Sequence, residues 1–258
     1  MILPVRSNFM EQTKIELRDR LIVALDVPTA TEALDLVAAL DGCVSFFKVG
    51  FQLFVSDGLL SKDSRLIQQL SNAGKKVFLD LKMDDVEETI RLTLAGIAQA
   101  DDSIRFVTIH GTGATAKAAR DGRGNSEYPK LLFVTLLSSL DQHDLHDLFM
   151  GQTIPLDTYV KFRAKQALDA GCDGLIASGR SVEMLRKEYP KTTIVTPGIR
   201  PPGSSTDEHK RSLSPREAIA AGSDYLVVGR PIRNAANPKN MAERIISEIE
   251  MELRERSG

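Results

Sequence analysis

Hydrophobic residues along this chain gather in short runs that recur between residues 21 and 229. Most of these runs are continuous rather than alternating, which is typical of parallel strands that are covered on both faces. Eight of the runs are predicted to be strands, at residues 21–26, 44–50, 76–82, 104–110, 131–137, 173–178, 193–198 and 224–229.

The segments between the runs have apolar residues at the spacing of amphipathic helices. This pattern is clearest at residues 31–40 and 85–100, and in the segment that begins with Asn237 and Pro238. Eight strands that alternate with helices predict an α/β fold, a (β/α)8 TIM barrel that forms a single domain over residues 21–258. An open doubly wound sheet is the alternative.

Three segments stand outside this alternation. Residues 1–20 are expected to form an N-terminal extension, for which helical structure is one option. Residues 118–130 and 198–213 are rich in glycine, proline and charged residues, and they are predicted to be long loops. Long loops in compact domains are often functional, so both loops are candidates for a role at a site.

Polar residues occur where almost every predicted strand ends. In a barrel of this kind the carboxyl ends of the strands form the rim that carries the active site. We therefore expect one pocket at this rim to be lined by Asp26, Lys48, Asp80, Lys82, His110, Ser138, Ser139, Arg200, Gly229 and Arg230.

The ends of the seventh and eighth predicted strands indicate a phosphate site. VVGRPI places Gly229 and Arg230 at the end of the eighth strand, and Arg200 follows the seventh. In TIM barrels phosphate often binds at these two loops, where glycine lets backbone N–H groups approach the anion and arginine offers two parallel hydrogen bonds. A phosphorylated substrate is therefore expected.

The stretch FLDLKMDDVEET contains the pattern D-x-K-x-x-D at Asp80, Lys82 and Asp85. Side chains two residues apart on a strand share a face, so Asp80 and Lys82 are expected to lie together, with Lys48 on the next strand. Alternating opposite charges offset the cost of desolvation and keep the lysines protonated and the acids ionised. Such a row can hold a cationic proton donor at a fixed point beside a substrate.

Each of these residues also has a structural interpretation. Asp26 could cap a turn, Lys48 could extend its ammonium to solvent, and His110 could be a half-buried structural residue. Asp85 and Glu88 have the spacing of a helix N-cap and its capping-box partner. The convergence of the polar residues at one rim is what favours a functional site.

The bulk composition excludes several classes of protein. A formal net charge of -2 gives no electrostatic case for binding nucleic acid or an anionic membrane. The N-terminal sequence lacks the apolar core of a signal peptide, and no apolar stretch reaches the roughly 20 residues that cross a bilayer. The two cysteines have no metal-ligand spacing, so we expect a cytoplasmic protein with two unreactive thiols.

From about residue 20 to residue 240, the motifs of the chain resemble those of the orotidine 5′-phosphate decarboxylase family. They are, in order, IVALDV, FFKVG, FLDLKMDDVEET, VTLLSSL, VTPGIRPPG, HKR and GSDYLVVGRPI. The D-x-K-x-x-D pattern alone is shared with a broader superfamily, whereas its combination with FFKVG, VTPGIR and VVGRPI is specific. The resemblance implies a barrel that decarboxylates orotidine 5′-monophosphate to UMP without a metal or an organic cofactor.

The resemblance also implies a role for individual residues. Lys82 would protonate the ring carbon that loses carbon dioxide, and Asp80 would lie beside the departing carboxylate. Lys48 would pair with the acids, and both Lys48 and Asp26 would contact the ribose. Ser138 would form a hydrogen bond with the pyrimidine.

The resemblance also implies which residues bind the phosphate of the substrate. Arg200, Gly229 and Arg230 would bind the phosphate, with the loop at 198–213 closing over it. His209 lies in this loop, where the family commonly has a glutamine that meets the phosphate. The histidine could still donate a hydrogen bond, in a manner sensitive to pH.

The family resemblance further implies a homodimer. Asp85 and Thr89 would reach into the active site of the neighbouring subunit, so the dimer would be required for activity. The chain departs from the family pattern close to these residues, because Asp84 replaces a usual histidine and Glu87-Glu88 replace Pro-Asn. The charged residues and Thr89 keep their spacing, so the chemistry is expected to survive.

Two alternatives stay open at the level of the sequence. Magnesium-dependent decarboxylases and aldolases that act on sugar phosphates also carry D-x-K-x-x-D, but they typically have a glutamate where Lys48 stands, and a lysine would repel Mg²⁺. A catalytically silent barrel that binds nucleotides is the second alternative, suggested by the substitutions at Asp84 and His209.

Overall fold

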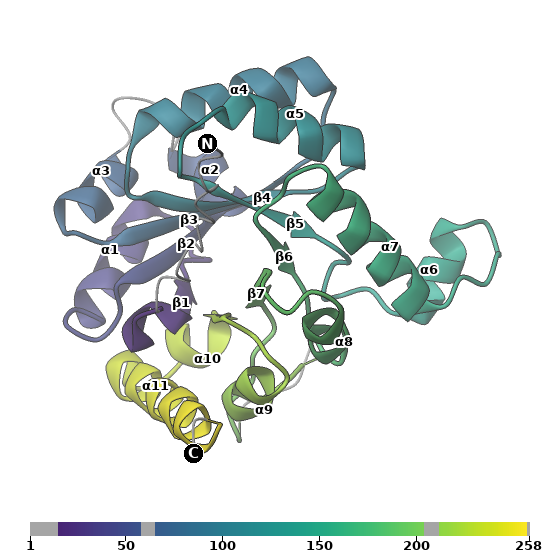
Figure 1. Ribbon diagram of the computed structural model, residues 1–258. Helices are drawn as coiled ribbons and strands as arrows, with labels where there is room; N and C mark the ends of the chain where they lie inside the picture. Colours follow the sequence, from purple (N-terminus) through teal and green to yellow (C-terminus); the bar gives the residue numbers. More distant parts are fainter. Residues whose placement is uncertain (1–14, 58–64, 204–211, 257–258) are drawn as a thin grey trace, which may run out of the picture.

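The structure, a computed structural model, describes residues 15–57, 65–203 and 212–256. Within these ranges eight parallel strands pair in sequence order and close into a barrel, so the predicted (β/α)8 fold is confirmed over the open sheet (Figure 1). The strands are β1 (Leu21–Ala24), β2 (Phe46–Gly50), β3 (Lys76–Met83), β4 (Ile104–Ile109), β5 (Lys130–Val134), β6 (Gly174–Ile176), β7 (Thr193–Thr196) and β8 (Tyr225–Val228).

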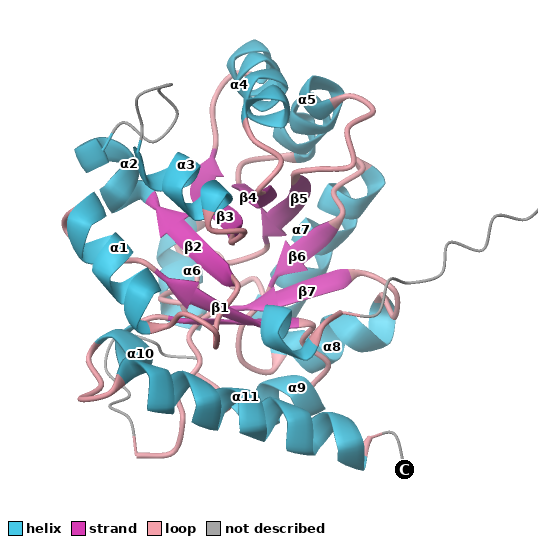
Figure 2. Ribbon diagram, turned by 90° about the vertical axis from the view of Figure 1, so that its left-hand side faces the viewer, coloured by secondary structure: helices cyan, strands magenta, loops and turns pink. Residues whose placement is uncertain are grey.

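Helices surround the barrel, and α11 lies along α9 and α10 on one side (Figure 2). They are η1 (Leu17–Arg20, a 3₁₀ helix), α1 (Ala30–Ala39), α2 (Phe51–Asp57), α3 (Arg65–Asn72), α4 (Glu87–Ala100), α5 (Gly113–Arg123), α6 (Gln142–Leu148), α7 (Leu156–Asp169), α8 (Ser181–Glu188), α9 (Pro215–Ala220), α10 (Arg230–Arg233) and α11 (Pro238–Glu255). The helix predicted at 31–40 is α1. The helix predicted to begin after Asn237 is α11, and the Asn237 side chain accepts a hydrogen bond from the backbone N–H of Asn240 at 3.0 Å.

One of the two predicted loops is partly helical. The prediction of a loop over 118–130 is wrong in its first half, because α5 continues to Arg123 and ends at Gly124, whose φ is 64°. Ala118 and Ala119 are buried on the inner face of α5, which stabilises the helix through a stretch that is otherwise charged and rich in glycine. The N-terminal extension at 1–20 stays a prediction, because residues 1–14 lie outside the described ranges.

The strands separate two apolar cores. One core lies between the barrel and its helices. The other fills the barrel interior, where the aromatic rings of Phe46 and Phe106 lie 5.0 Å apart between centroids and Phe106 lies 5.0 Å from Tyr225. Because strand side chains alternate, the same inward row continues upward from Phe46 to Lys48, from Phe78 to Asp80 and from Phe106 to a threonine. The barrel interior is therefore apolar at the level of Phe46, Phe78 and Phe106, and polar from Lys48 and Asp80 toward the carboxyl ends of the strands.

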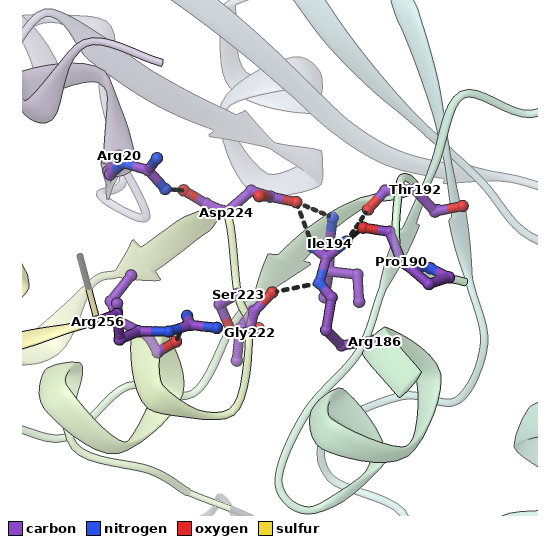
Figure 3. A network of polar contacts seen from close by, with 11 residues as sticks. Arg20, Arg186, Pro190, Thr192, Ile194, Gly222, Ser223, Asp224 and Arg256 are labelled. Atoms are coloured by element: carbon purple, nitrogen blue, oxygen red, sulfur yellow. Dashed lines mark hydrogen bonds and ion pairs between the residues drawn. The ribbon is translucent and has the colours of Figure 1, made fainter. Parts of the chain in front are cut away.

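A network around Arg186 ties α8 to the starts of β7 and β8 (Figure 3). The Arg186 guanidinium donates hydrogen bonds to the carbonyls of Gly222, Pro190 and Thr192 and to the carboxylate of Asp224, at 2.6–2.9 Å. The same carboxylate accepts from the backbone N–H of Ile194 at 2.8 Å. Gly222 has a φ of 105°, and a Cβ there would lie 2.6 Å from Cγ of Arg186, so only glycine fits beneath this side chain. The network fixes the end of the barrel opposite the site described next.

Candidate active site

A cavity of about 830 Å³ opens at the carboxyl ends of the strands, where the sequence predicts the site. Its volume lies in the roughly 300–1,000 Å³ range of small-ligand sites. The predicted residues that line it are Asp26, Lys48, Asp80, Lys82, Ser138, Ser139, Arg200, Gly229 and Arg230. Residues from seven of the eight strands and the segments that follow them therefore meet in one space.

Four charged side chains form a row on one wall of this cavity. Nζ of Lys48 lies 2.9 Å from Oδ1 of Asp26 and 3.3 Å from Oδ2 of Asp80, and Nζ of Lys82 lies 2.8 Å from Oδ1 of Asp80. The Lys48 residue is only 8% exposed, whereas 43% of the Lys82 side chain is exposed. The buried lysine therefore holds the acids together, and the accessible lysine faces the cavity.

The row keeps its charges because each charge has an opposite neighbour. Burial alone would raise the pKa of Asp80, but the Lys48 and Lys82 ammonium groups bring it below the ordinary value. Burial alone would likewise lower the pKa of Lys48, but Asp80 and Asp26 bring it above the ordinary value. At neutral pH, Lys48 is protonated and Asp80 is ionised.

The backbone of β3 leaves the regular strand at this row. β3 pairs with β4 at Leu79↔Val107 and next at Met83↔Ile109, so residues 80–82 stand opposite a single residue of β4. Lys82 has a φ of 48°, in the left-handed region that residues other than glycine rarely adopt. Such outliers persist where the surrounding structure holds them, and they are concentrated at functional sites.

Thr108 is the β4 residue opposite this bulge, and sequence reasoning missed it. Its hydroxyl accepts a hydrogen bond from the backbone N–H of Lys82 at 2.8 Å and donates one to Oδ1 of Asp80 at 3.0 Å. The signal in the sequence is its position two residues after Phe106, which matches the position of Asp80 two residues after Phe78. Arg233 was also missed; it lines the cavity, and its guanidinium donates to the backbone carbonyl of Asp26.

Gly50 leaves room for the buried lysine. It pairs with Asp80 across β2 and β3. A Cβ at Gly50 would lie 3.1 Å from Nζ of Lys48 and 3.4 Å from Oδ1 of Asp26. A side chain at this position would therefore press on the ion pair between these two residues.

The same cavity is also lined by the predicted anion-binding residues. Gly229 directly follows β8 and is the N-cap residue of α10, which begins at Arg230. Arg200 follows β7, and its backbone N–H donates to the carbonyl of Leu213 at 2.8 Å, which ties the two ends of the predicted loop 198–213 together. Two arginines and a glycine thus face the same cavity as the charged row.

Four predicted residues are not among those lining the cavity. Asp85 and Thr89 are exposed on the segment after β3, outside the cavity of their own chain. His209 lies outside the described residues. His110 is half-buried at the end of β4, where its Nδ1 lies 3.7 Å from Asp84, and burial together with the nearby Arg163 lowers its pKa.

The prediction that Asp85 caps the following helix is wrong. α4 begins at Glu87, its N-cap residue is Val86, and no side chain caps it. The Asp85 carboxylate accepts instead from the backbone N–H of Val86 at 2.6 Å. Glu88 cannot complete a capping box because both of its carboxylate oxygens accept from Arg91, at 2.7 and 2.8 Å.

The family of the chain follows from comparison with known proteins. A family model described as "Orotidine 5'-phosphate decarboxylase / HUMPS family" matches residues 19–245. The chain belongs to this family. The resemblance drawn from the sequence motifs is thereby confirmed.

Members of the orotidine 5′-phosphate decarboxylase / HUMPS family resemble the chain over most of its length. An orotidine 5′-phosphate decarboxylase of Rhodopseudomonas palustris is 44% identical over 91% of this chain and 96% of its own. The orotidine 5′-phosphate decarboxylase of Methylococcus capsulatus is 41% identical over 94% of this chain and 96% of its own. The crystal structure of the Lactobacillus acidophilus enzyme matches with a TM-score of 0.75 and 34% identity, over 90% of this chain and 99% of that chain.

Two further observations concern the described residues of this family member. No group of three or more His, Cys, Asp or Glu side chains in the described ranges is arranged to hold a metal ion. Among the helices of those same ranges, none has the length and apolar character needed to cross a membrane.

Proposed function

We propose that this chain decarboxylates orotidine 5′-monophosphate to UMP and carbon dioxide. The observation that carries the proposal is the row of Asp26, Lys48, Asp80 and Lys82 in a cavity that two predicted phosphate-binding arginines, Arg200 and Arg230, also line. Membership of the family and the names of its relatives support the same reaction.

In this proposal Lys82 is the proton donor. The bond between the pyrimidine ring and its carboxylate breaks, carbon dioxide leaves, and the electron pair stays on the ring carbon. Nζ of Lys82 then gives that carbon a proton, and the resulting amine regains a proton from solvent. An ammonium fixed by Asp80 also stabilises the negative charge as it develops, without reorganising at the moment of reaction.

Asp80 and Lys48 would prepare this step. Asp80 would lie beside the substrate carboxylate, where two negative charges repel each other until carbon dioxide departs. Lys48 would keep Asp80 ionised and, with Asp26, contact the ribose hydroxyls. The ion pair at 2.9 Å between Lys48 and Asp26 holds both side chains in place.

The phosphate would be held at the other end of the cavity. Arg200 and Arg230 supply the positive charge, Gly229 offers backbone next to it, and Ser138 would contact the pyrimidine between the two ends. Binding energy from the remote phosphate can then be used to hold the ring against the charged row. The proposed contact of His209 with the phosphate belongs to this end, although His209 lies outside the described residues.

We also propose that the active form is a homodimer. Asp85 and Thr89 are exposed and do not line the cavity of their own chain, so they are available to a partner. Val86, between them, is 69% exposed, and Phe51, which follows the neighbouring strand at the cavity, is 64% exposed. Large apolar side chains beside a functional rim are typical of an interface.

We further propose that the enzyme is active without an added metal or organic cofactor. We also propose that it works in the cytoplasm. Lys48 at the centre of the row supports the first point, because its ammonium would repel a divalent cation next to Asp80. The two cysteines, Cys43 and Cys172, are free and buried, and burial raises the pKa of Cys172 to about 12, which fits a reducing compartment.

One assay tests the reaction against both alternatives. Purified protein is mixed with orotidine 5′-monophosphate, and the loss of substrate absorbance is followed with and without EDTA. We expect turnover that EDTA leaves unchanged. Loss of turnover in EDTA that Mg²⁺ restores would favour the magnesium-dependent alternative, and UMP binding without turnover would favour the silent barrel.

A further inference from the structure

Thr108 stands alone opposite an irregular part of the neighbouring strand. Between the pairs Leu79↔Val107 and Met83↔Ile109, β3 has residues 80–82 and β4 has only Thr108. Thr108 is 1% exposed, so its hydroxyl is removed from bulk water and must find its partners within the protein.

The hydroxyl closes a ring of hydrogen bonds with the two residues of the proposed chemistry. It accepts from the backbone N–H of Lys82 at 2.8 Å and donates its hydrogen to Oδ1 of Asp80 at 3.0 Å. The same oxygen of Asp80 accepts from Nζ of Lys82 at 2.8 Å. The backbone and the side chain of Lys82 are therefore both linked to one carboxylate oxygen, and Thr108 supplies the link from the backbone.

This link has a conformational task. A lysine at a φ of 48° is strained, and it keeps that conformation only if the surrounding structure holds it there. The bulge takes the N–H of Lys82 out of the regular ladder, so this donor needs another acceptor. A threonine hydroxyl can accept that hydrogen bond and donate another from one atom, whereas valine, of nearly the same shape, can do neither.

We propose that Thr108 is a positioning residue, which holds Lys82 in its left-handed conformation and orients the Asp80 carboxylate, so that the ammonium points at the reacting carbon. This inference rests on the proposed function. It assigns Thr108 no contact with substrate and no role in binding the ribose or the phosphate. Its loss should therefore affect the chemical step far more than it affects binding.

The test compares Thr108→Val, which removes the hydroxyl, with Thr108→Ser, which keeps it. We expect kcat of Thr108→Val to fall about 100-fold, the effect of a displacement near 1 Å at a reacting group. KM and the Kd for UMP are expected to change by less than about threefold, because the phosphate contacts are untouched. Thr108→Ser is expected to keep kcat within about fivefold of the unmodified protein.

A matched control separates positioning from loss of stability. Thr196 is a fully buried barrel threonine whose hydroxyl hydrogen-bonds with that of Ser223 at 2.5 Å. Thr196→Val loses the same chemical group without touching Lys82, so its kcat is expected to stay within about twofold of the unmodified protein. If Thr108→Val does not fold, Thr108→Ala provides a second variant without the hydroxyl.

Three results would overturn the inference. They are equal losses of kcat in Thr108→Val and Thr108→Ser, a loss in Thr196→Val as large as that in Thr108→Val, or a parallel rise of KM and fall of kcat. If the unmodified protein does not turn over orotidine 5′-monophosphate, the proposed function fails by itself. A crystal structure of Thr108→Val then decides the inference separately: a negative φ at Lys82 supports it, and an unchanged φ overturns it.

Discussion

Nζ of Lys82 lies 2.8 Å from the carboxylate of Asp80, although the backbone between these two residues departs from a regular strand. In an ideal strand, alternation alone would place both side chains on one face. Here the bulge exposes the Lys82 side chain to the cavity while Asp80 stays largely buried against Lys48. Within this one ion pair, Lys82 is exposed to the cavity and Asp80 is held against the buried Lys48.

Replacing the exposed lysine should remove turnover and leave the fold intact. Because Lys82 is proposed both to donate the proton and to stabilise the developing charge, Lys82→Ala is expected to lower kcat at least about 1,000-fold. Circular dichroism and thermal unfolding should report a folded protein. Lys117→Ala, which removes a surface lysine paired with Asp121, is the control and should keep full activity. Turnover retained in Lys82→Ala would remove this residue from the mechanism.

A single methyl group at Gly50 should disturb the row without unfolding the protein. The Cβ of Gly50→Ala would lie 3.1 Å from Nζ of Lys48, an ammonium that Asp26 and Asp80 hold in place. We expect kcat/KM to fall about tenfold as the ion pairs shift.

The matched control for that change is a helical glycine. A Cβ at Gly96 in α4 would have no atom within 4 Å, so Gly96→Ala is expected to keep its activity. It should stabilise the helix by about 0.5–1 kcal/mol, measured by urea unfolding. Equal activity in Gly50→Ala and Gly96→Ala would show that the space at Gly50 is not needed.

Most of the fold could be predicted from the sequence because parallel strands in a barrel have a strong pattern. All eight predicted runs contain a strand, since continuous apolar stretches between helices have few other solutions. The loop predicted over 118–130 failed in its first half because charged and glycine residues dominate the local pattern, whereas two buried alanines decide the helix.

The site was only partly predictable, for a related reason. The convergence of Asp26, Lys48, Asp80 and Lys82 follows from alternation and from the position of strand ends, which are local properties. The bulge in β3 and the role of Thr108 depend on pairing with β4, and a threonine in an apolar strand looks the same whether or not a bulge faces it. The Asp85 cap failed because its carboxylate accepts from the backbone N–H of the adjacent Val86, and the capping box failed because Glu88 pairs with Arg91.

Removing the arginine that begins α10 should weaken phosphate binding selectively. Arg230 lines the cavity beside Gly229, and a charge-assisted hydrogen bond is worth about 1.5–3 kcal/mol. Arg230→Ala is therefore expected to raise the Kd of UMP about 10- to 100-fold, while the Kd of uridine changes less than about threefold. Calorimetry measures both, with the exposed Arg244→Ala as the control. Equal losses for UMP and uridine would contradict a phosphate contact.

The ion pairs of Asp80 should make part of the stability depend on pH. The pKa of Asp80 in the folded chain lies below the ordinary value of 3.8. The contribution of Asp80 to the free energy of unfolding is therefore complete above pH 3.8, and it is lost as the pH falls toward the lower pKa of the folded chain. We expect Asp80→Asn to lower the free energy of unfolding by about 3 kcal/mol at pH 7.

The difference between Asp80→Asn and the unmodified protein should shrink below about pH 4, because protons then bind the unfolded carboxylate first. Urea unfolding at several pH values measures it, with Asp121→Asn as an exposed control. A difference that stays constant from pH 7 to pH 3 would mean that the lysines do not hold Asp80 in its charged form.

A mixing experiment tests whether Asp85 acts across a subunit interface. Lys82→Ala and Asp85→Ala should each be nearly inactive when assayed alone. In a mixed dimer, one site combines the intact Lys82 of one chain with the intact Asp85 of the other, and the second site carries both substitutions. If the subunits exchange freely, half of the dimers are mixed and half of their sites are active, so activity should recover to about a quarter of that of the unmodified protein.

A site built from a single chain predicts a different result for the same mixture. If each site used the Asp85 of its own chain, every site would carry one substitution and no activity would return on mixing. Exchange is verified by mass spectrometry of the mixed dimers, so that absence of recovery can be attributed to the geometry. Thr89→Ala in place of Asp85→Ala repeats the test with the third residue of α4, on the same exposed segment.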